Sequence, residues 1–534
     1  MGTCGALRQR REPETGVLFR CVHAEWNTFV QRAEAGERVV PRSCRREVEG
    51  FLHCGILGYG FARVHCDACK QDCVVAFSCK GRGFCPSCGT RRMVDTAAWL
   101  VDRVIPEVPV RQWVLSLPYR VRHVCAYDAE VCAAVRGILV RAVSAFYERR
   151  ARQQGKSRPR AGAVAFVQRF DSALRVNLHF HVLWTDGVFA HQLREGRVEF
   201  CEHDALSDAD VAKLVRRIRD RVLRCLRQRG KLPAAGEEGV DGSERGDSDE
   251  LLVELAAASV QGRATLGERA GEWDQRVGRG TRSEPFVKGP LCADVDGFSL
   301  HAAVRVEARD RDRLEHLCRY AGRAAIAENR LSELPDGRVA YSLKKRWKDG
   351  TTHVVMTKQV LMERLCALVP RPRRHLVTYH GVFAPAAGIR RWVVPQVEAE
   401  GAPPASALGA SAGLVSAAVR AVVGGGPPSP GGVCLQAEFA ESARRTLSAR
   451  ASGARRKRRT GPRRRYPWAE LLRRVFLIEV LVCPRCGGPR RLLAAIQDPE
   501  SIRRVLGSLG LSAVVPELAA ARSPPRQGEL EFEG

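Results

Sequence analysis

The stretch "NLHFHVLWTDGVF", residues 177–189, alternates like a β-strand and places two histidines on either side of a phenylalanine. Successive side chains of a strand point to opposite faces, so His179 and His181 share one face while Leu178, Phe180 and Val182 enter the opposite layer. Two neighbouring imidazoles on one face suit a divalent metal ion. An isolated His-x-His motif is more often a hydrogen-bonded pair on a solvated sheet face, so the rest of the chain decides between the two interpretations.

The surrounding segments predict a mixed α/β (α+β) domain built on an antiparallel sheet with packed helices. Apolar strand patterns occur at residues 111–118, 162–170 and 297–307, and a long helical pattern occupies residues 127–154. Asp312 and Glu315 form a capping-box pattern that predicts a further helix beginning there. Asp349 and Gly350 supply the turn of a hairpin expected over residues 337–356.

The balance of charge indicates a polyanionic partner. The chain has 534 residues, and 87 basic against 59 acidic residues give a formal net charge of +28. Residues 444–474 hold thirteen Arg or Lys against Glu470 alone, a composition that binds nucleic acid electrostatically. No segment approaches the roughly 18 apolar residues of a membrane span, and the N-terminus lacks the apolar core of a signal peptide. We therefore expect a cytoplasmic protein with no membrane partner.

Changes of composition along the chain predict four regions. Residues 1–105 contain a dense cysteine cluster, and residues 106–400 contain the α/β domain with a helical and acidic insertion at about residues 190–290. Residues 401–440 are rich in Gly, Pro, Ala and Ser and are expected to form a flexible linker. Residues 441–534 form a basic C-terminal region that contains a C-x2-C knuckle.

The N-terminal cysteines have the spacing of a zinc site. Cys66, Cys69, Cys85 and Cys88 form the pattern C-x2-C-x15-C-x2-C. Each knuckle offers two thiolates to one tetrahedral ion, and disulfides are rare in the cytoplasm. The pattern predicts one structural zinc site in a zinc-ribbon domain.

The other cysteines leave alternatives open. Cys79 lies inside the loop of the predicted ribbon and can replace one ligand, or join a second site with Cys54 or His65. Cys73 lies in the same loop. Cys483 and Cys486 form a further knuckle with no obvious partner pair. An incomplete zinc site and a structural turn explain that knuckle equally well.

A tyrosine completes the set of chemically active side chains. Tyr320, in "LEHLCRYAGR", falls on the flank of an apolar helical stripe, where its ring can pack while its hydroxyl reaches outward. The stripe consists of Leu314, Leu317, Cys318, Ala321 and Ala325. Most single tyrosines in such positions are half-buried amphipathic residues without a catalytic role.

The order of these segments resembles a known family. A zinc ribbon is followed by "FVQRF", "LHFHVLWTDGVF", "DGFSLHAAVRV" and "LCRYAGR", and then by the hairpin. This order is similar to that of the rolling-circle transposases of the insertion sequence 91 family, which belong to the HUH (His, hydrophobic, His) endonucleases. The resemblance covers about residues 50–395 and implies an HUH-endonuclease-like catalytic domain in a bacterial, nucleoid-associated protein.

The resemblance implies a transposase that nicks and rejoins single-stranded DNA at the ends of a mobile element. In such enzymes a tyrosine attacks a phosphate and forms a 5′-phosphotyrosine, and by match that residue is Tyr320. His179 and His181 match the ligands of a catalytic Mg²⁺ or Mn²⁺ ion. Gln168 is the favoured third ligand because its "QRF" matches the family pattern, and Asp171 and His301 are the alternatives. Structural Zn²⁺ would occupy the cysteine site.

The chain departs from the family pattern at one position. Members with two catalytic tyrosines carry Y-x-x-x-Y, whereas His316 stands four residues before Tyr320. The chain therefore resembles a single-tyrosine variant, and Tyr379 is the remaining candidate for a second nucleophile. The residues expected to contact DNA are Arg319, Arg323, Lys344, Lys345 and Arg346.

Two other functions fit part of the pattern. A rolling-circle replication initiator or a relaxase would share the histidines and the tyrosine. A noncatalytic zinc-dependent DNA-binding protein would keep the ribbon and the basic tail without a metal at His179 and His181. Self-association into a homo-oligomer is compatible with each of these functions.

Overall fold

The computed structural model describes residues 12–191, 198–231, 247–266, 270–272, 275–277, 289–347, 349–395, 470–471, 473 and 481–522. All of these residues belong to one compact unit, Met1–Pro395 together with Tyr466–Gly534. The expected linker at 401–440 and nearly all of the basic segment at 444–474 lie outside the described residues.

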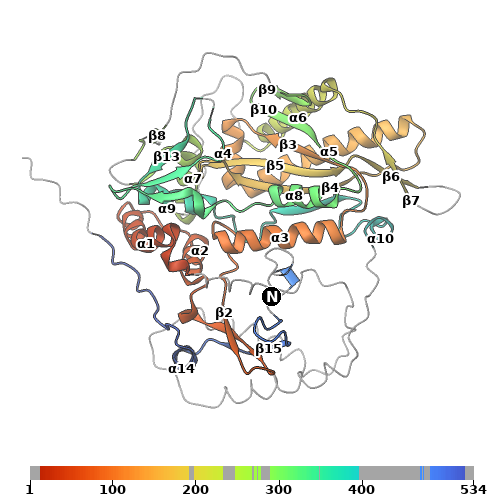
Figure 1. Cartoon of the computed structure of the whole chain (residues 1–534). Coiled ribbons are helices and arrows are strands. Elements are labelled where there is room, and N and C mark those ends of the chain that lie inside the picture. Colours follow the sequence, from red (N-terminus) through yellow and green to blue (C-terminus); the bar gives the residue numbers. More distant parts are fainter. Residues whose placement is uncertain are drawn as a thin grey trace, which may run out of the picture. The chain divides into compact units, whose positions relative to one another are not determined.

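An antiparallel sheet forms the centre of this unit, as the strand patterns predict (Figure 1). Within the described residues it has six strands in the order β14-β4-β5-β3-β10-β9, and every neighbouring pair is antiparallel. The strands are β3 (Val110–Ser116), β4 (Gly162–Phe170), β5 (Val176–Thr185), β9 (Cys292–Val295), β10 (Phe298–Val306) and β14 (Val377–Gly381). The predicted strands agree with the observed ones to within one or two residues, except that the 177–189 stretch divides into β5 and β6 (Gly187–His191).

Helices cover both faces of the sheet. Leu178, Phe180 and Val182 of β5 are buried in one hydrophobic core with α4 (Tyr119–Tyr127), α5 (Ala129–Gln153) and α6 (Asp208–Gln228). Phe166 and Leu183 belong to a second core, which contains apolar residues of α3 (Pro86–Arg103) and α8 (Arg311–Ala321). Alternate side chains of β5 therefore enter these two cores, and His179 and His181 lie on the face that α8 covers.

A second antiparallel sheet, β11-β12-β13-β8, confirms the predicted hairpin. Its strands are β8 (Gln275–Val277), β11 (Leu331–Glu333), β12 (Val339–Ser342) and β13 (His353–Met356). In the turn, Gly350 has a φ of +84°, and Asp349 Oδ1 accepts from the backbone N–H of Thr351 at 3.1 Å. The helices α1 (Val17–Ala35), α2 (Arg42–His53), α7 (Asp247–Gln261) and α9 (Lys358–Leu368) contribute to the core with this sheet, and β7 (Val198–Glu202) pairs with β6.

The cap of α8 differs from the prediction. Asp310, two residues earlier than the expected Asp312, is the N-cap, and its Oδ1 accepts from the backbone N–H of Arg313 at 3.1 Å. Glu315 instead forms an ion pair with Arg319 one turn later. The capping-box prediction was wrong because Asp310 caps the helix alone, with Arg313 and not a glutamate three residues on, whereas the position of the helix itself is confirmed.

The two ends of the chain meet in a third sheet. The strand β15 (Arg490–Ile496) pairs antiparallel with β1 (Phe61–Cys66), which also pairs with β2 (Asp72–Ala76). The helix α14 (Pro499–Ser508) follows β15 and buries Ile502 and Leu506 against Leu57 and Phe61. In the described part of the chain, no helix is long and apolar enough to cross a membrane.

A buried ion network joins α5 to three strands of the central sheet. Asp186 is 3 % exposed and accepts two hydrogen bonds from Arg111, at 2.8 and 2.7 Å. It also accepts from the Tyr147 hydroxyl at 2.9 Å and from Arg305 Nε at 2.9 Å. Burial alone would raise the pKa of Asp186, but these donors outweigh it and hold the pKa below its usual value.

We predict that Asp186→Asn destabilises the domain built on the central sheet by about 3–5 kcal/mol, because Arg111 is left buried without its counter-charge. Denaturant unfolding measures this loss. The carboxylate contributes fully above the pKa of an unfolded aspartate, about 3.9, and the contribution disappears as the pH falls through the lower folded value. The control is Asp296→Asn in the exposed pair with Arg219, which should cost less than about 1 kcal/mol. A similarly small loss for Asp186→Asn would contradict the prediction.

Candidate active site and metal centres

The two histidines of β5 lie side by side on the face covered by α8. Their ring centroids are 5.0 Å apart, and His181 is 4 % exposed. In the antiparallel register, His179 lies opposite Gln168 of β4 and Ser116 of β3. Directly opposite residues in an antiparallel pair share a face, with Cβ atoms about 4.5–5.5 Å apart. The register therefore brings Gln168 beside the histidine pair.

Burial keeps both imidazoles neutral near pH 7. Desolvation lowers the pKa of His179 to about 4 and that of His181 to about 3, and the nearby positive charge of Arg323 lowers both further. His179 Nδ1 donates to the carbonyl oxygen of Asn177 at 2.7 Å, so its Nε2 carries a free lone pair. His181 Nδ1 accepts from the Gln112 amide at 3.1 Å. Neutral imidazole is the form that binds metal ions.

Gln168 presents an unsatisfied oxygen in this buried place. Its Nε2 donates to the carbonyl oxygens of Tyr320 and Ala321, at 3.0 and 2.8 Å. Its Oε1 is buried and has no hydrogen-bond partner among the described residues. A buried polar atom without a partner costs about 1–3 kcal/mol. An amide oxygen beside two imidazoles fits the donor set expected for a hard divalent cation with open coordination positions.

The two alternative third ligands are less suitable. The carboxylate of Asp171 is engaged by Arg175 at 2.8 Å and by the backbone N–H groups of the turn between β4 and β5. His301 lies on β10, separated from β5 by β3. No carboxylate, thiol or third imidazole in the described part of the chain forms a cluster with His179 and His181. Gln168 remains the preferred candidate.

Tyr320 of α8 lies against the histidine pair. Its ring centroid is 5.6 Å from that of His181, with an interplanar angle of 82°. Arg323 and Lys344 flank the ring, with Cζ and Nζ at 5.1 and 5.6 Å from its centroid. Tyr320 is 43 % exposed, so the site is open to a large substrate. The hydrogen bond from Gln168 to its backbone carbonyl ties α8 to β4 at this point.

The cysteines form two four-residue clusters among the described residues. Cys54, Cys79, Cys85 and Cys88 form one, and Cys66, Cys69, Cys483 and Cys486 form the other. Sulfur–sulfur distances are 3.4–3.8 Å in the first cluster, and in the second each N-terminal sulfur lies 3.5 Å from a C-terminal one. Four sulfurs at about 2.3 Å from a tetrahedral zinc ion would be about 3.8 Å apart, whereas a disulfide is about 2.05 Å long. Each cluster can therefore hold one zinc ion.

The expected single site of Cys66, Cys69, Cys85 and Cys88 is not formed. Its two knuckles belong to different clusters, because β2 lies between them in the chain and each knuckle meets another pair of cysteines. Cys79 joins a second site with Cys54, one of the two alternatives that the sequence left open. His65 Nδ1 instead contacts Asp72 Oδ1 at 2.7 Å.

The C-terminal knuckle completes the second cluster. Backbone N–H groups of Arg485 and Cys486 point at Cys483 Sγ, and despite burial they lower the pKa of this thiol to about 6. Such a thiol ionises readily, as a metal ligand must. The pairing of β15 with β1 brings this knuckle to Cys66 and Cys69.

Two family models match the chain. The model described as "Putative transposase" matches residues 162–390, which contain the histidine pair, Gln168 and Tyr320. The transposase zinc-binding domain of the insertion sequence 91 type matches residues 21–117. The chain belongs to the insertion sequence 91 family of transposases. No curated protein and no solved structure matches it.

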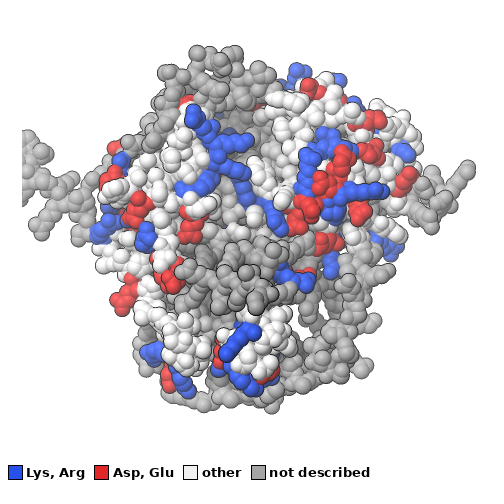
Figure 2. Space-filling view, in the orientation of Figure 1, with Lys and Arg blue, Asp and Glu red and all other residues white. Residues whose placement is uncertain are grey.

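The transposase is thus a DNA-processing enzyme with a zinc-binding domain before the region that matches the transposase model. The zinc-binding match includes the first cysteine cluster and half of the second, and Cys483 and Cys486 lie outside both matches. Figure 2 shows that on one face of the transposase Lys and Arg side chains gather in a band near the middle of the view, with acidic side chains on both sides of it.

The predicted DNA contacts divide into two groups. Arg323 and Lys344 lie at the tyrosine, whereas Lys345 and Arg346 are exposed farther along the hairpin. The Arg319 guanidinium is paired with Glu315. These roles in DNA binding stay predictions.

Two aromatic residues, Trp347 of the hairpin and the second-nucleophile candidate Tyr379, are engaged in packing. Trp347 donates from Nε1 to Ser172 Oγ at 3.1 Å, and Arg175 stacks over its ring at 4.7 Å. Tyr379 of β14 is half-buried against the core on the α8 side of the sheet. The sequence did not identify Gln112 as a residue of the site, although it contacts His181. No sequence motif indicates that a glutamine in one strand will lie beside a histidine of another.

We predict two zinc ions in each chain of the purified transposase. Cys483→Ser with Cys486→Ser should reduce this number to one, because only the second cluster loses ligands. Elemental analysis together with a colorimetric zinc assay measures the stoichiometry. The matched control replaces Cys201 and Cys225, which are half-buried outside both clusters, and should keep both ions. Two ions in the Cys483/Cys486 variant would contradict the assignment.

Proposed function

We propose that the transposase cuts and rejoins single-stranded DNA at the ends of its element by transesterification through Tyr320. The observation that carries this proposal is the contact of the Tyr320 ring with His181 beside the unsatisfied oxygen of Gln168. A nucleophile, two neutral imidazoles and a free amide oxygen converge there, next to two cations that suit a phosphate. A noncatalytic DNA-binding protein has no need of this convergence.

In the first step the Tyr320 oxygen attacks a backbone phosphorus. A phosphorus–oxygen bond to the tyrosine forms, and the bond to the 3′ oxygen breaks. The products are a 5′-phosphotyrosine and a DNA 3′-hydroxyl, which receives a proton as the phenol loses one. The ester conserves the bond energy of the phosphodiester, so a later attack by a 3′-hydroxyl reverses the exchange and joins two DNA ends. A rolling-circle type of transposition requires this cutting and joining.

The surrounding residues would position the phosphate and prepare the site. His179, His181 and Gln168 would hold Mg²⁺ or Mn²⁺, which supplies charge neutralisation at the transferring phosphoryl group. For His181 to offer Nε2, the Gln112 amide must turn so that its oxygen accepts from Nδ1–H. Arg323 and Lys344 would attract the phosphate to the face of the tyrosine ring.

A single nucleophile sets the order of events. His316 lies one helical turn before Tyr320, where members with two catalytic tyrosines carry the other one, and Tyr379 is half-buried against the core. The transposase would therefore form one covalent link at a time and release it before the next. Two simultaneous links would need a second copy of the chain.

We predict that purified transposase forms a covalent adduct with labelled single-stranded DNA carrying element ends, and that Tyr320→Phe abolishes it. The adduct should require Mg²⁺ or Mn²⁺, and denaturing electrophoresis detects it. The matched control is Tyr119→Phe, because Tyr119 and Tyr320 are both 43 % exposed, and this variant should keep the adduct. An adduct that persists in Tyr320→Phe and disappears in Tyr379→Phe would show that Tyr320 is the wrong nucleophile.

We also predict that Gln168→Leu weakens Mn²⁺ binding at the histidine site at least tenfold. Leucine has a similar volume but removes the amide oxygen, while both zinc clusters lie elsewhere and should stay loaded. Electron paramagnetic resonance titration of the zinc-loaded protein measures Mn²⁺ affinity without any cleavage assay. Unchanged affinity would exclude Gln168 as a ligand, and a simultaneous loss of zinc would show general misfolding instead.

A further inference from the structure

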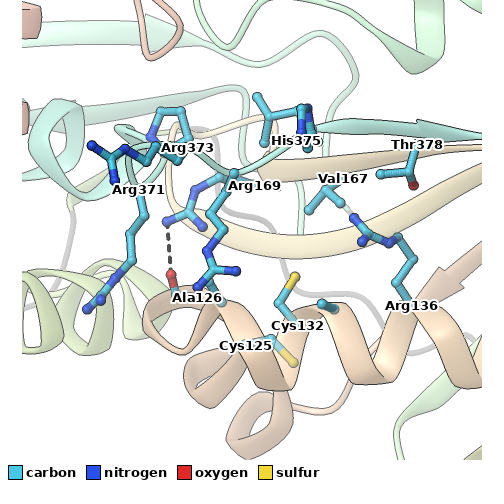
Figure 3. Close-up of a pocket in the computed structure, with 15 residues that line it drawn as sticks. Cys125, Ala126, Cys132, Arg136, Val167, Arg169, Arg371, Arg373, His375 and Thr378 are labelled. Carbon is cyan, nitrogen blue, oxygen red and sulfur yellow. Dashed lines mark hydrogen bonds between the residues drawn. The ribbon is translucent and has the colours of Figure 1, made fainter.

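A cavity of about 160 Å³ lies on the face of the central sheet opposite the histidine pair (Figure 3). The strand β4 contributes to both places. Gln168 points toward the histidines, whereas its neighbours Val167 and Arg169 line the cavity. The remaining lining comes from α5, the end of α4, and residues 370–378 before and within β14. Adjacent residues of β4 therefore serve the two places, which lie on opposite faces of the sheet.

Five guanidinium groups surround this cavity. Arg136, Arg169, Arg371, Arg373 and Arg374 line it together with His375, and no acidic residue is among the described residues that line it. Figure 3 shows side chains of Arg136, Arg169 and Arg371 reaching into this region from α5, β4 and the loop before β14. Converging positive charges without carboxylates repel one another, so an anion is the expected occupant.

The positive charges of two of these residues, Arg169 and Arg136, are only partly neutralised by neighbouring groups. Arg169 donates to the carbonyl oxygens of Ala126 and Ala367, at 3.0 and 3.2 Å, and its Nε is buried with no partner in the described part of the chain. Burial lowers the pKa of the Arg169 and Arg136 guanidiniums, because it removes part of the water around their positive charges. Carbonyl dipoles fix the position of Arg169 without neutralising its charge.

The floor of the cavity is apolar. Ala129, Ala133, Val167 and Leu376 line it, and the Cys125 and Cys132 thiols are held neutral because burial raises the pKa of both. An engineered apolar cavity of about 150 Å³ holds a benzene ring. A cavity of this size therefore has room for one flat aromatic group beneath the arginines.

We propose that this cavity binds one nucleotide of a single-stranded DNA, with its base on the apolar floor and its phosphate on the arginine rim. Arginine is suited to phosphate because its planar fork donates two parallel hydrogen bonds. The site would hold the DNA strand at a second point, on the other side of the sheet from Tyr320. This site rests on the proposed single-stranded DNA substrate, but it does not depend on which residue is the nucleophile.

The first zinc-binding cluster supports the rim of this cavity. Arg82, in the loop between Cys79 and Cys85, donates to the carbonyl oxygen of Arg374. Gly83 of the same loop lies against Val369, just before the rim segment. The zinc-binding domain would thereby help to hold the arginines that contact the nucleotide.

The test measures binding of a fluorescent single-stranded oligonucleotide to the full-length zinc-loaded protein, without added Mg²⁺ or Mn²⁺ so that no cleavage occurs. Arg136→Gln with Arg373→Gln removes two positive charges from the cavity. We expect at least a tenfold loss of affinity, and a log–log salt slope smaller by about 0.7 for each phosphate that is no longer neutralised. The matched control is Arg216→Gln with Arg224→Gln, exposed on α6, which removes the same charge and should change affinity less than twofold.

A second variant tests the base. Ala133→Leu fills the floor and keeps every arginine, so it should weaken binding of the normal oligonucleotide but not of an abasic one. Equal affinity losses in the cavity and control arginine pairs would overturn the proposal, since they would reflect net charge alone. If Ala133→Leu has no effect while the cavity arginines matter, the site binds phosphate without a base, and the nucleotide assignment is wrong. Circular dichroism excludes misfolding of each variant.

Discussion

The antiparallel register between β4 and β5 places Gln168 opposite His179, and both proposed DNA sites depend on this register. Side chains alternate with a period of two, so a slip of β5 by one residue would turn the histidines into the apolar core, and a slip of β4 would carry Arg169 to the histidine face. The register is strongly specified because Leu178, Phe180, Val182 and Trp184 fill a closed core on the other side. Packing of ordinary apolar residues thus determines where the chemistry occurs.

This arrangement keeps unsatisfied polar groups in a stable framework. Two neutral imidazoles and an unpartnered amide oxygen are buried on one face of β4 and β5, and an unpartnered guanidinium nitrogen lies at the other, among the residues that the structure describes. At the far end of β5, the Asp186 network is fully paired and fixes the sheet against α5. The Asp186 network serves stability and is paired inside the protein, whereas the unpartnered Gln168 oxygen and Arg169 nitrogen lie where the proposed ligands would bind.

Local patterns in the sequence were sufficient for the elements but not for the long-range pairings. The alternating pattern of β4 and β5 and the turn at Asp349–Gly350 depend only on residues close together in the sequence, so both could be predicted from it. The knuckles of Cys66/Cys69, Cys85/Cys88 and Cys483/Cys486 have the same C-x2-C spacing, and spacing alone cannot assign partners among them. Only the pairing of β15 with β1, which are far apart in the sequence, joins the last knuckle to the first. Likewise the choice among Gln168, Asp171 and His301 required knowing which polar atoms were already engaged.

The central claim is that a pair of imidazoles, an amide oxygen and one phenol act on the same phosphodiester. Its most direct test is mass spectrometry of the protein–DNA adduct after nuclease trimming and trypsin digestion. The account predicts that the residual nucleotide is attached to the peptide Tyr320–Arg323, at Tyr320. A nucleotide attached to any other residue would contradict the account, even if the enzyme transfers DNA strands.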